Sequence, residues 1–299
     1  MQKLAVWLGI PVAIFLSLIG WMYWYWMLAP HQLTADVQYG VRDQKPLMMD
    51  VLTPPEANGA GILFMVSGGW KSSTDPTSPT LFAPLLRSGY TVFGVKHISQ
   101  PECTVSNIVK DVQRAVRYVR LHAEEYNVDP QRLGVVGGSS GGHLSLMLGT
   151  CADDGNPNAE DPVERVSSAV QCVACFYPPT DLLNLGSSTE NPGDGGPPKS
   201  FRAGFGKRAE SLEEWKILGR ELSPIYHITP QMPPTFIVHG DADTLVPVDQ
   251  SQRFAEQARQ QQAVVRLEIR PGKGHGWPGM LMDLLRFAEW FDEHLLVKR

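Results

Sequence analysis

The sequence is poor in cysteine and carries no excess of positive charge. Only four cysteines occur among 299 residues, so buried apolar side chains rather than a disulfide framework must hold the fold together. Lysine and arginine number 26 against 31 aspartates and glutamates, which gives a formal charge of −5. No long run of like charge occurs, so we expect no nucleic-acid partner. A hydrophobic content of 43% without internal repeats indicates one globular domain of generous size.

Two of the cysteines form a C-x-x-C motif, which elsewhere carries redox chemistry or zinc. Cys172 and Cys175 lie in an apolar run at 170–177 that is typical of a buried strand. In a strand their Cα atoms would be roughly 10 Å apart, with side chains on opposite faces, which is too far for a disulfide. No second ligand pair accompanies them, so we expect neither a metal nor a cofactor. The oxidation state of Cys103 and Cys151 stays open.

The long hydrophobic run of the sequence is at its beginning. Residues 4–29 contain no charge, and as a helix they would be about 39 Å long, more than the roughly 30 Å hydrocarbon core requires. The aromatic cluster at 21–26 resembles an interfacial belt. We predict a single-pass membrane anchor with its linker at 1–33, and a catalytic domain at 34–299 on the outer side. Secretion after cleavage of a signal peptide is the alternative.

After a predicted linker at 30–35, short apolar runs alternate with helical patterns. The predicted strands are 47–52, 61–66, 91–95, 133–136, 170–176, 235–238 and 264–269. Apolar positions spaced as one helix face occur at 105–119, behind Thr104 as N-cap, and again at 281–295. This alternation predicts a mostly parallel sheet with helices on both faces. The segment 184–226 interrupts it and indicates an insertion at the edge of the sheet.

A glycine-rich turn joins the predicted strand 133–136 to a helix. Its sequence, GGSSGG at 137–142, is the strand–turn–helix context that a nucleophile elbow needs, where the helix N-terminus favours developing negative charge. Two frames of G-x-S-x-G fit, centred on Ser139 and on Ser140, and the distance from the strand end favours Ser139. A phosphate-binding turn is the alternative, but no Walker lysine follows and the spacing is not G-x-G-x-x-G.

Two later loops supply an acid and a base in the order that this arrangement requires. A turn with Asp241 and Asp243 follows one predicted strand, and a glycine-rich loop with His275 follows the next. Such loops share one edge of a parallel sheet, where sites form. A serine hydroxyl needs a base, and that imidazole needs a carboxylate. The Asp-x-x-Val-Pro frame favours Asp243, while His239 and His143 fit local packing better than the role of the base.

Backbone donors for an oxyanion are expected after the predicted strand 61–66. The glycine turn there offers the amides of Gly68 and Gly69, to which the amide of Ser140 adds a third. Trp70 and Trp277 are candidates for the wall of the substrate pocket, although either could equally belong to the core.

Four motifs resemble the α/β-hydrolase superfamily, and within it the esterase/lipase group of hormone-sensitive-lipase-like and feruloyl- or acetyl-esterase-like enzymes. They are GGSSGGHL at 137–144, FYPPTDL at 176–182, HGDADTLVP at 239–247 and GHGW at 274–277. The resemblance implies an α/β-hydrolase fold, with Ser139 as nucleophile, Asp243 as orienting acid and His275 as general base. The usual His-Gly-Gly-Gly-Trp loop is Val-Ser-Gly-Gly-Trp at 66–70 here, and 184–226 corresponds to the cap region.

The sequence therefore predicts a serine carboxylic-ester hydrolase that acts on a small-molecule ester through an acyl-enzyme. A prolyl-oligopeptidase-like serine peptidase and a non-catalytic, membrane-tethered binding protein of the same fold are the alternatives. Acyl length, the alcohol moiety and the oligomeric state are left open by the sequence.

Overall fold

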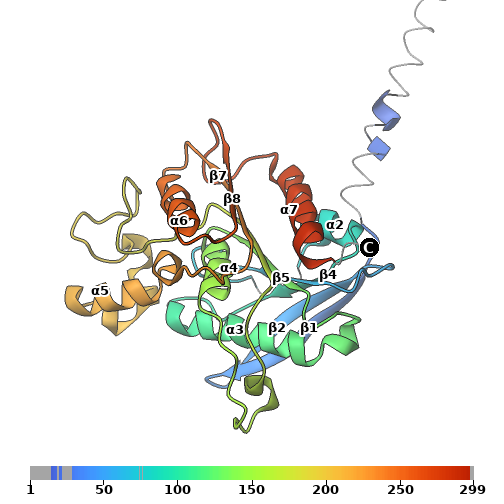
Figure 1. The fold of residues 1–299 in the computed structure, drawn as a ribbon. Helices are drawn as coiled ribbons and strands as arrows, with labels where there is room; N and C mark the ends of the chain where they lie inside the picture. The colour runs from blue at the N-terminus through green and yellow to red at the C-terminus, as the bar shows by residue number, and fades with distance from the viewer. Residues whose placement is uncertain (1–14, 19, 22–28, 74, 76, 297–299) are drawn as a thin grey trace, which may run out of the picture.

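The fold is given by a computed structural model that describes residues 15–18, 20, 21, 29–73, 75 and 77–296 (Figure 1). Within these residues no helix combines the length and the apolarity needed to cross a membrane. The predicted anchor segment, 4–29, lies for the most part outside the described residues.

Eight strands form one sheet in the order β1-β2-β4-β3-β5-β6-β7-β8. The strands are β1 Gln32–Arg42, β2 Lys45–Thr53, β3 Gly61–Met65, β4 Thr91–Val95, β5 Leu133–Gly138, β6 Cys172–Phe176, β7 Thr235–Gly240 and β8 Val265–Arg270. The pairs from β4 to β8 are all parallel, whereas β2 is antiparallel to both of its neighbours. The prediction of a mostly parallel sheet is confirmed, and the carboxyl ends of its central strands share one edge.

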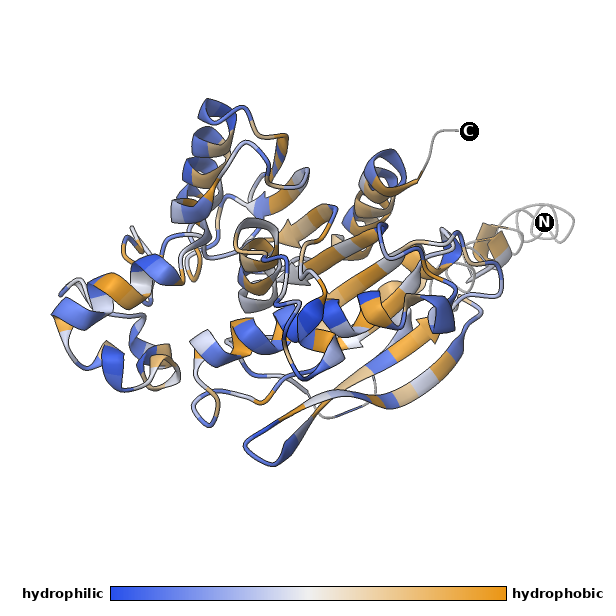
Figure 2. Cartoon of the chain, turned by 60° about the horizontal axis from the view of Figure 1, so that its bottom comes forward, coloured by the Kyte–Doolittle hydropathy of each residue, from blue (hydrophilic) through white to orange (hydrophobic). Residues whose placement is uncertain are grey.

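Helices cover both faces of this sheet, as predicted (Figure 1). The long helices are α2 Pro79–Arg87, α3 Val105–Leu121, α4 Ser140–Thr150, α5 Leu212–Glu221, α6 Asp249–Gln260 and α7 Met280–Leu295. Buried side chains of α2 and α7 pack on one face, and those of α3, α4 and α6 pack on the other. Thr104 caps α3 as expected, because its side chain accepts the amide of Asn107. The central strands are hydrophobic along most of their length (Figure 2), which is typical of parallel strands covered on both faces.

Short 3-10 helices complete the connections. They are η1 Ala123–Tyr126, η2 Pro162–Arg165, η3 Lys199–Phe205, η4 Lys207–Ala209 and η5 Pro224–His227. The interrupting segment, 184–226, contains η3, η4 and α5, and α5 lies at the far left of Figure 1, beyond α6.

One expectation about the start of the domain is wrong. The segment predicted as a linker, 30–35, is not a linker throughout, because β1 begins at Gln32. Tyr39 is the only buried residue of β1, so the strand lacks the apolar alternation by which strands are recognised. The strand lies at the sheet edge, where it pairs with β2 through two irregularities in register.

The C-x-x-C motif lies in the buried strand β6, as predicted. Cys172 packs with the α2 and α7 side of the core, whereas Cys175 packs with the α4 side. All four cysteines are free thiols.

Candidate active site

Ser139 occupies the turn between β5 and α4 in a strained backbone conformation. Its φ of +55° and ψ of −122° lie in a region that non-glycine residues adopt at a cost of about 1–3 kcal/mol. The neighbouring chain holds it there, because the Ser139 amide donates to the Phe176 carbonyl at 3.0 Å. The Ser139 carbonyl in turn accepts the His143 amide at 2.9 Å. Strain of this kind is concentrated at functional sites.

The glycine at position 141 lets this turn approach the neighbouring strand. A Cβ atom added to Gly141 would lie 2.7 Å from the Met65 carbonyl oxygen at the end of β3. Any larger residue would push the start of α4 away from β3. The backbone of the turn at Ser139 is therefore in direct contact with the backbone at the end of β3.

His275 lies between Ser139 and Asp243. Its Nε2 atom is 2.9 Å from the Ser139 Oγ atom, and its Nδ1 atom is 2.7 Å from Asp243 Oδ2. The Asp243 side chain is fully buried, whereas 23% of the His275 side chain is exposed. With Nδ1 as the donor to the carboxylate, Nε2 is free to accept the serine proton. The structure brings the three side chains into the order that proton transfer from the serine requires.

The Asp243 carboxylate is stabilised in its charged form. Burial by itself would raise its pKa, but hydrogen bonds from His239, His275 and the Val246 amide outweigh burial and hold the pKa well below its usual range. The second oxygen, Oδ1, accepts the Leu245 amide at 2.9 Å and the Val246 amide at 3.0 Å. Asp243 therefore stays ionised beside the imidazole, as an orienting carboxylate must.

The rival acid and bases have other partners. Asp241 is exposed and accepts the Gly272 amide at 2.6 Å, which closes the turn before His275. His239 is buried, and its Nε2 atom lies 2.8 Å from the Val246 carbonyl oxygen and 3.4 Å from Asp243 Oδ2, so it supports the carboxylate as a buried neighbour. His143 donates from Nε2 to the Leu222 carbonyl at 2.7 Å, and burial lowers its pKa to about 4.

The loop after β3 forms a tight two-residue turn, which changes the set of expected oxyanion donors. Gly69 and Trp70 both have positive φ, +57° and +55°, and the Lys71 amide donates to the Gly68 carbonyl at 3.0 Å. The Gly68 amide also donates to the Lys71 carbonyl at 2.9 Å, so this predicted donor is not available to an oxyanion. The Gly69 amide has no partner among the described residues. The Ser140 amide is the first of α4, so it has no hydrogen-bond acceptor within its helix. The amides of Gly69 and Ser140 are therefore the two remaining candidates for oxyanion donors.

A second hydrogen-bond chain lies beneath this loop, and the sequence analysis missed it. The imidazole of His97 donates from Nδ1 to the Ile98 carbonyl at 2.9 Å, which leaves Nε2 to accept the Ser67 hydroxyl at 2.9 Å. The Ser67 oxygen then accepts the Ser140 hydroxyl at 3.1 Å. Burial lowers the pKa of His97, which keeps the ring neutral and Nε2 an acceptor. The one sequence signal for these hydrogen bonds was Ser67, which stands where the usual His-Gly-Gly-Gly-Trp loop has a glycine.

Tyr177 is a further site residue that the sequence analysis did not single out. Its ring lies against the His275 ring, with centroids 4.4 Å apart, and its φ of +35° is unusual for a non-glycine residue. Burial raises the pKa of Tyr177 to about 12, so its hydroxyl remains a hydrogen-bond donor at neutral pH. Its place within the FYPPTDL motif was the available signal.

Two cavities of unequal size meet at Ser139. The smaller, about 70 Å³, has Trp70 and Phe201 among its lining residues. The larger, about 580 Å³, is lined by His275, Tyr177 and apolar residues of α2 and α7. Of the two candidate wall residues, Trp70 lines the smaller cavity. Trp277 lines neither of these two, because its indole donates to Asp283 at 2.8 Å and its rings pack on Tyr177.

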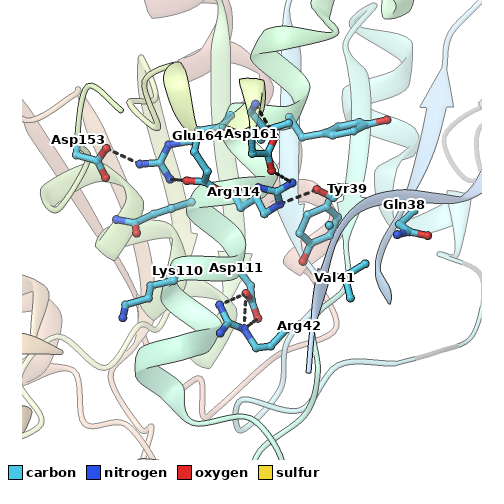
Figure 3. A pocket seen from close by; sticks show the side chains of 15 residues that line it. Gln38, Tyr39, Val41, Arg42, Lys110, Asp111, Arg114, Asp153, Asp161 and Glu164 are labelled. Carbon is cyan, nitrogen blue, oxygen red and sulfur yellow. Dashed lines mark hydrogen bonds and ion pairs between the residues drawn. The ribbon is translucent and has the colours of Figure 1, made fainter. Parts of the chain in front are cut away.

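A third cavity, of about 820 Å³, lies between β1, α3 and η2, and is strongly charged (Figure 3). Its arginines are all paired with carboxylates: Arg42 with Asp111, Arg114 with Asp161 and Glu164, and Arg117 with Asp153. None of the three residues Ser139, Asp243 and His275 lines it. In the described part of the chain, no group of three or more histidine, cysteine or acidic residues is placed to hold a metal ion.

Comparisons with known proteins point to esterases. The family model BD-FAE matches residues 49–258. Esterase LipQ of Mycobacterium tuberculosis is 30% identical over 230 residues, which are 76% of this chain and 52% of LipQ. The chain spans about half the length of the curated relatives it matches.

The solved structures similar to this chain also include ester hydrolases. A truncated form of a carbohydrate esterase from gut microbiota is 25% identical with a TM-score of 0.73, covering 88% of this chain and 95% of that one. An acetyl ester-xyloside bifunctional hydrolase from Caldicellulosiruptor lactoaceticus is 26% identical with a TM-score of 0.69, covering 89% and 95%.

Proposed function

Because the chain belongs to the BD-FAE family and its relatives and structural neighbours are esterases, we propose that it is a serine carboxylic-ester hydrolase that acts through an acyl-enzyme. The observation that carries the proposal is the continuous contact from Ser139 through His275 to Asp243. Its substrates are small-molecule esters, in keeping with the names of its relatives.

In the first half of the reaction, the Ser139 Oγ atom attacks the ester carbonyl carbon while His275 Nε2 takes the hydroxyl proton. The charged imidazole is stabilised by the Asp243 carboxylate, which itself stays unprotonated. The negative charge on the carbonyl oxygen is met by the amides of Gly69 and Ser140. One such donor is worth about 3 kcal/mol in the transition state.

The tetrahedral species then collapses. The bond to the alcohol oxygen breaks, and His275 gives its proton to the departing alcohol. In the second half, His275 takes a proton from a water molecule as the water attacks the acyl carbon. The proton returns to Ser139 Oγ as the acid is released.

The test uses two single variants with an aryl acetate as substrate. Ser139→Ala should lower kcat by several orders of magnitude while the protein stays folded. Ser140→Ala is the comparison variant: it keeps the Ser140 amide and removes the hydroxyl that donates to Ser67, so it should lose no more than about tenfold in kcat. An active Ser139→Ala, or a dead Ser140→Ala beside it, contradicts the assignment of the nucleophile.

We also propose how the chain is arranged around this site. The uncharged N-terminal segment serves as a membrane anchor and places the catalytic domain, which includes Ala29 and β1, on the outer side of the membrane. The segment 184–226 acts as a cap that shapes substrate choice, because Leu185, Ser188 and Phe201 line the smaller cavity beside Ser139.

A further inference from the structure

We propose that the preferred substrates are esters of short acyl groups with long apolar alcohols, an inference that rests on the proposed function. The smaller cavity at Ser139 would take the acyl group, and the larger cavity, called here the leaving-group cleft, would take the alcohol. Both assignments follow from the chemistry of the site and the lining of the two cavities.

The position of His275 decides which cavity takes the alcohol. The departing alcohol oxygen receives its proton from His275, so it must lie within hydrogen-bond reach of that ring. Of the two cavities that meet at Ser139, only the leaving-group cleft has His275 in its lining. The alcohol therefore leaves through the cleft, and the acyl chain extends into the smaller cavity.

The smaller cavity suits a short acyl group. Its volume is about 70 Å³, against about 580 Å³ for the leaving-group cleft. The longer of the two chains of the ester therefore belongs in the cleft.

One wall of the smaller cavity, Trp70, is tightly packed. Trp70 is only 3% exposed, and its ring packs edge-on against Phe201 and Phe205, with centroids 5.5 Å and 5.4 Å away. The indole nitrogen also donates to His143 at 3.2 Å. An acyl chain could not extend towards Trp70 without displacing this packed group.

The leaving-group cleft is larger and apolar. Its volume is about 580 Å³, and Leu81, Met280 and Leu284 contribute side chains from α2 and α7. Among the described residues, no lysine, arginine, aspartate or glutamate lines it. Leu81 is 43% exposed at the cleft, where an alkyl chain would cover it. Each methylene of the alcohol that becomes buried should raise kcat/KM about fourfold.

The most direct test compares octyl acetate with methyl nonanoate. The two esters are isomers, so they have the same composition and differ only in which side of the ester bond carries the long chain. We expect kcat/KM for octyl acetate to exceed that for methyl nonanoate by more than tenfold. Equal values, or a preference for methyl nonanoate, would overturn the assignment of the cavities.

Hydrolysis of 4-nitrophenyl acetate separates failure of this inference from failure of the proposed function. If the wild-type protein does not cleave this activated ester, the proposed function falls and the inference falls with it. If the ester is cleaved and methyl nonanoate is still preferred, only the inference falls.

Two variants of exposed leucines test whether the leaving-group cleft binds the alcohol chain. Leu81→Gln, in the cleft, should lower kcat/KM for octyl acetate at least fivefold more than for ethyl acetate. Leu121→Gln is the matched control, because Leu121 is 41% exposed at the end of α3, outside the proposed cap, and lines neither cavity at Ser139. It should leave both rates unchanged. A Leu81→Gln protein that loses activity equally on both esters would contradict a role of the cleft in binding the alcohol chain.

Discussion

At the scale of single residues, the two acids of the turn after β7 have different environments. Asp243 contacts His275 through one oxygen and two backbone amides through the other, whereas Asp241 accepts the Gly272 amide of the turn. In the proposed mechanism the first carboxylate fixes the imidazole tautomer, whereas the second holds a loop in place.

This difference predicts unequal effects of the two isosteric variants. Asp243→Asn should lower kcat/KM for an aryl acetate by on the order of 10⁴-fold, because an amide does not hold the required tautomer or stabilise the imidazolium. Asp241→Asn keeps an oxygen acceptor for the Gly272 amide and should lose less than about tenfold. Steady-state kinetics of both proteins provides the check, and equal losses would leave Asp243 without its assigned role.

Ser67 is the residue that links the elbow to the buried His97. It accepts the Ser140 hydroxyl and donates to His97, and it directly precedes the turn that carries the Gly69 amide. We expect Ser67→Ala to lower kcat about tenfold with KM nearly unchanged, because the Gly69 and Ser140 amides then lose a part of their alignment. Ser73→Ala, at an exposed site of the same loop, is the control. A KM effect without a kcat effect would assign Ser67 to binding instead.

At the scale of elements, His143 joins α4 to the end of α5. It donates to the Leu222 carbonyl and accepts the Trp70 indole, and burial lowers its pKa from about 6.5 to about 4. Because the folded pKa is below the unfolded one, this group's contribution is complete above about pH 6.5 and is lost as the pH falls towards 4. At about 1.4 kcal/mol per pKa unit, the loss amounts to roughly 3 kcal/mol.

The corresponding measurement is the free energy of unfolding in urea at pH 7 and at pH 4.5. The wild-type protein should lose stability between these values, and His143→Gln, which cannot be protonated, should lose markedly less. An equal drop in both proteins would show that the acid sensitivity arises elsewhere.

The elements differ in how far the sequence predicts them, for physical reasons. The strands β4 and β6 are buried along their whole length, so each leaves an unbroken apolar run in the sequence. The edge strand β1 buries only Tyr39 and leaves no such pattern. The motifs that follow the strands predicted that Ser139, Asp243 and His275 lie close together, because the loops after parallel strands share one edge of the sheet.

The backbone of the loop after β3, which carries the proposed oxyanion donor Gly69, could not be predicted in the same way. The positive φ of Trp70 has no sequence signature, and it is this turn that uses the Gly68 amide internally. Likewise, Ser67 and His97 are 30 residues apart in sequence, and they meet because the strands that precede them, β3 and β4, are parallel neighbours.

At the scale of the whole molecule, the site and the predicted anchor are separate features. Ser139, Asp243 and His275 follow the carboxyl ends of β5, β7 and β8. The anchor prediction rests on the uncharged run at 4–29. Ala29, where the described chain resumes, is buried among side chains of α2 and α7, so a truncated protein should begin no later than this residue.

The full-length protein should therefore fractionate with membranes and resist extraction by alkaline carbonate. A chain that begins at Ala29 should remain in the soluble fraction with an unchanged kcat/KM, because β1 and the rest of the sheet stay complete. Mass spectrometry of the mature N-terminus in the native host adds a second check. A protein that begins near Pro30 there would show a cleaved signal peptide and exclude the anchor.

The nucleophilic role of Ser139 is tested most directly by covalent labelling of the intact chain. The full-length protein is treated with the organophosphate paraoxon, and its mass and its peptides are analysed. We predict one phosphoryl group per chain, on the peptide position of Ser139, with parallel loss of esterase activity and no adduct on Ser139→Ala. An adduct on Ser140, or ester hydrolysis that continues unchanged in a fully labelled protein, would contradict the assignment of Ser139.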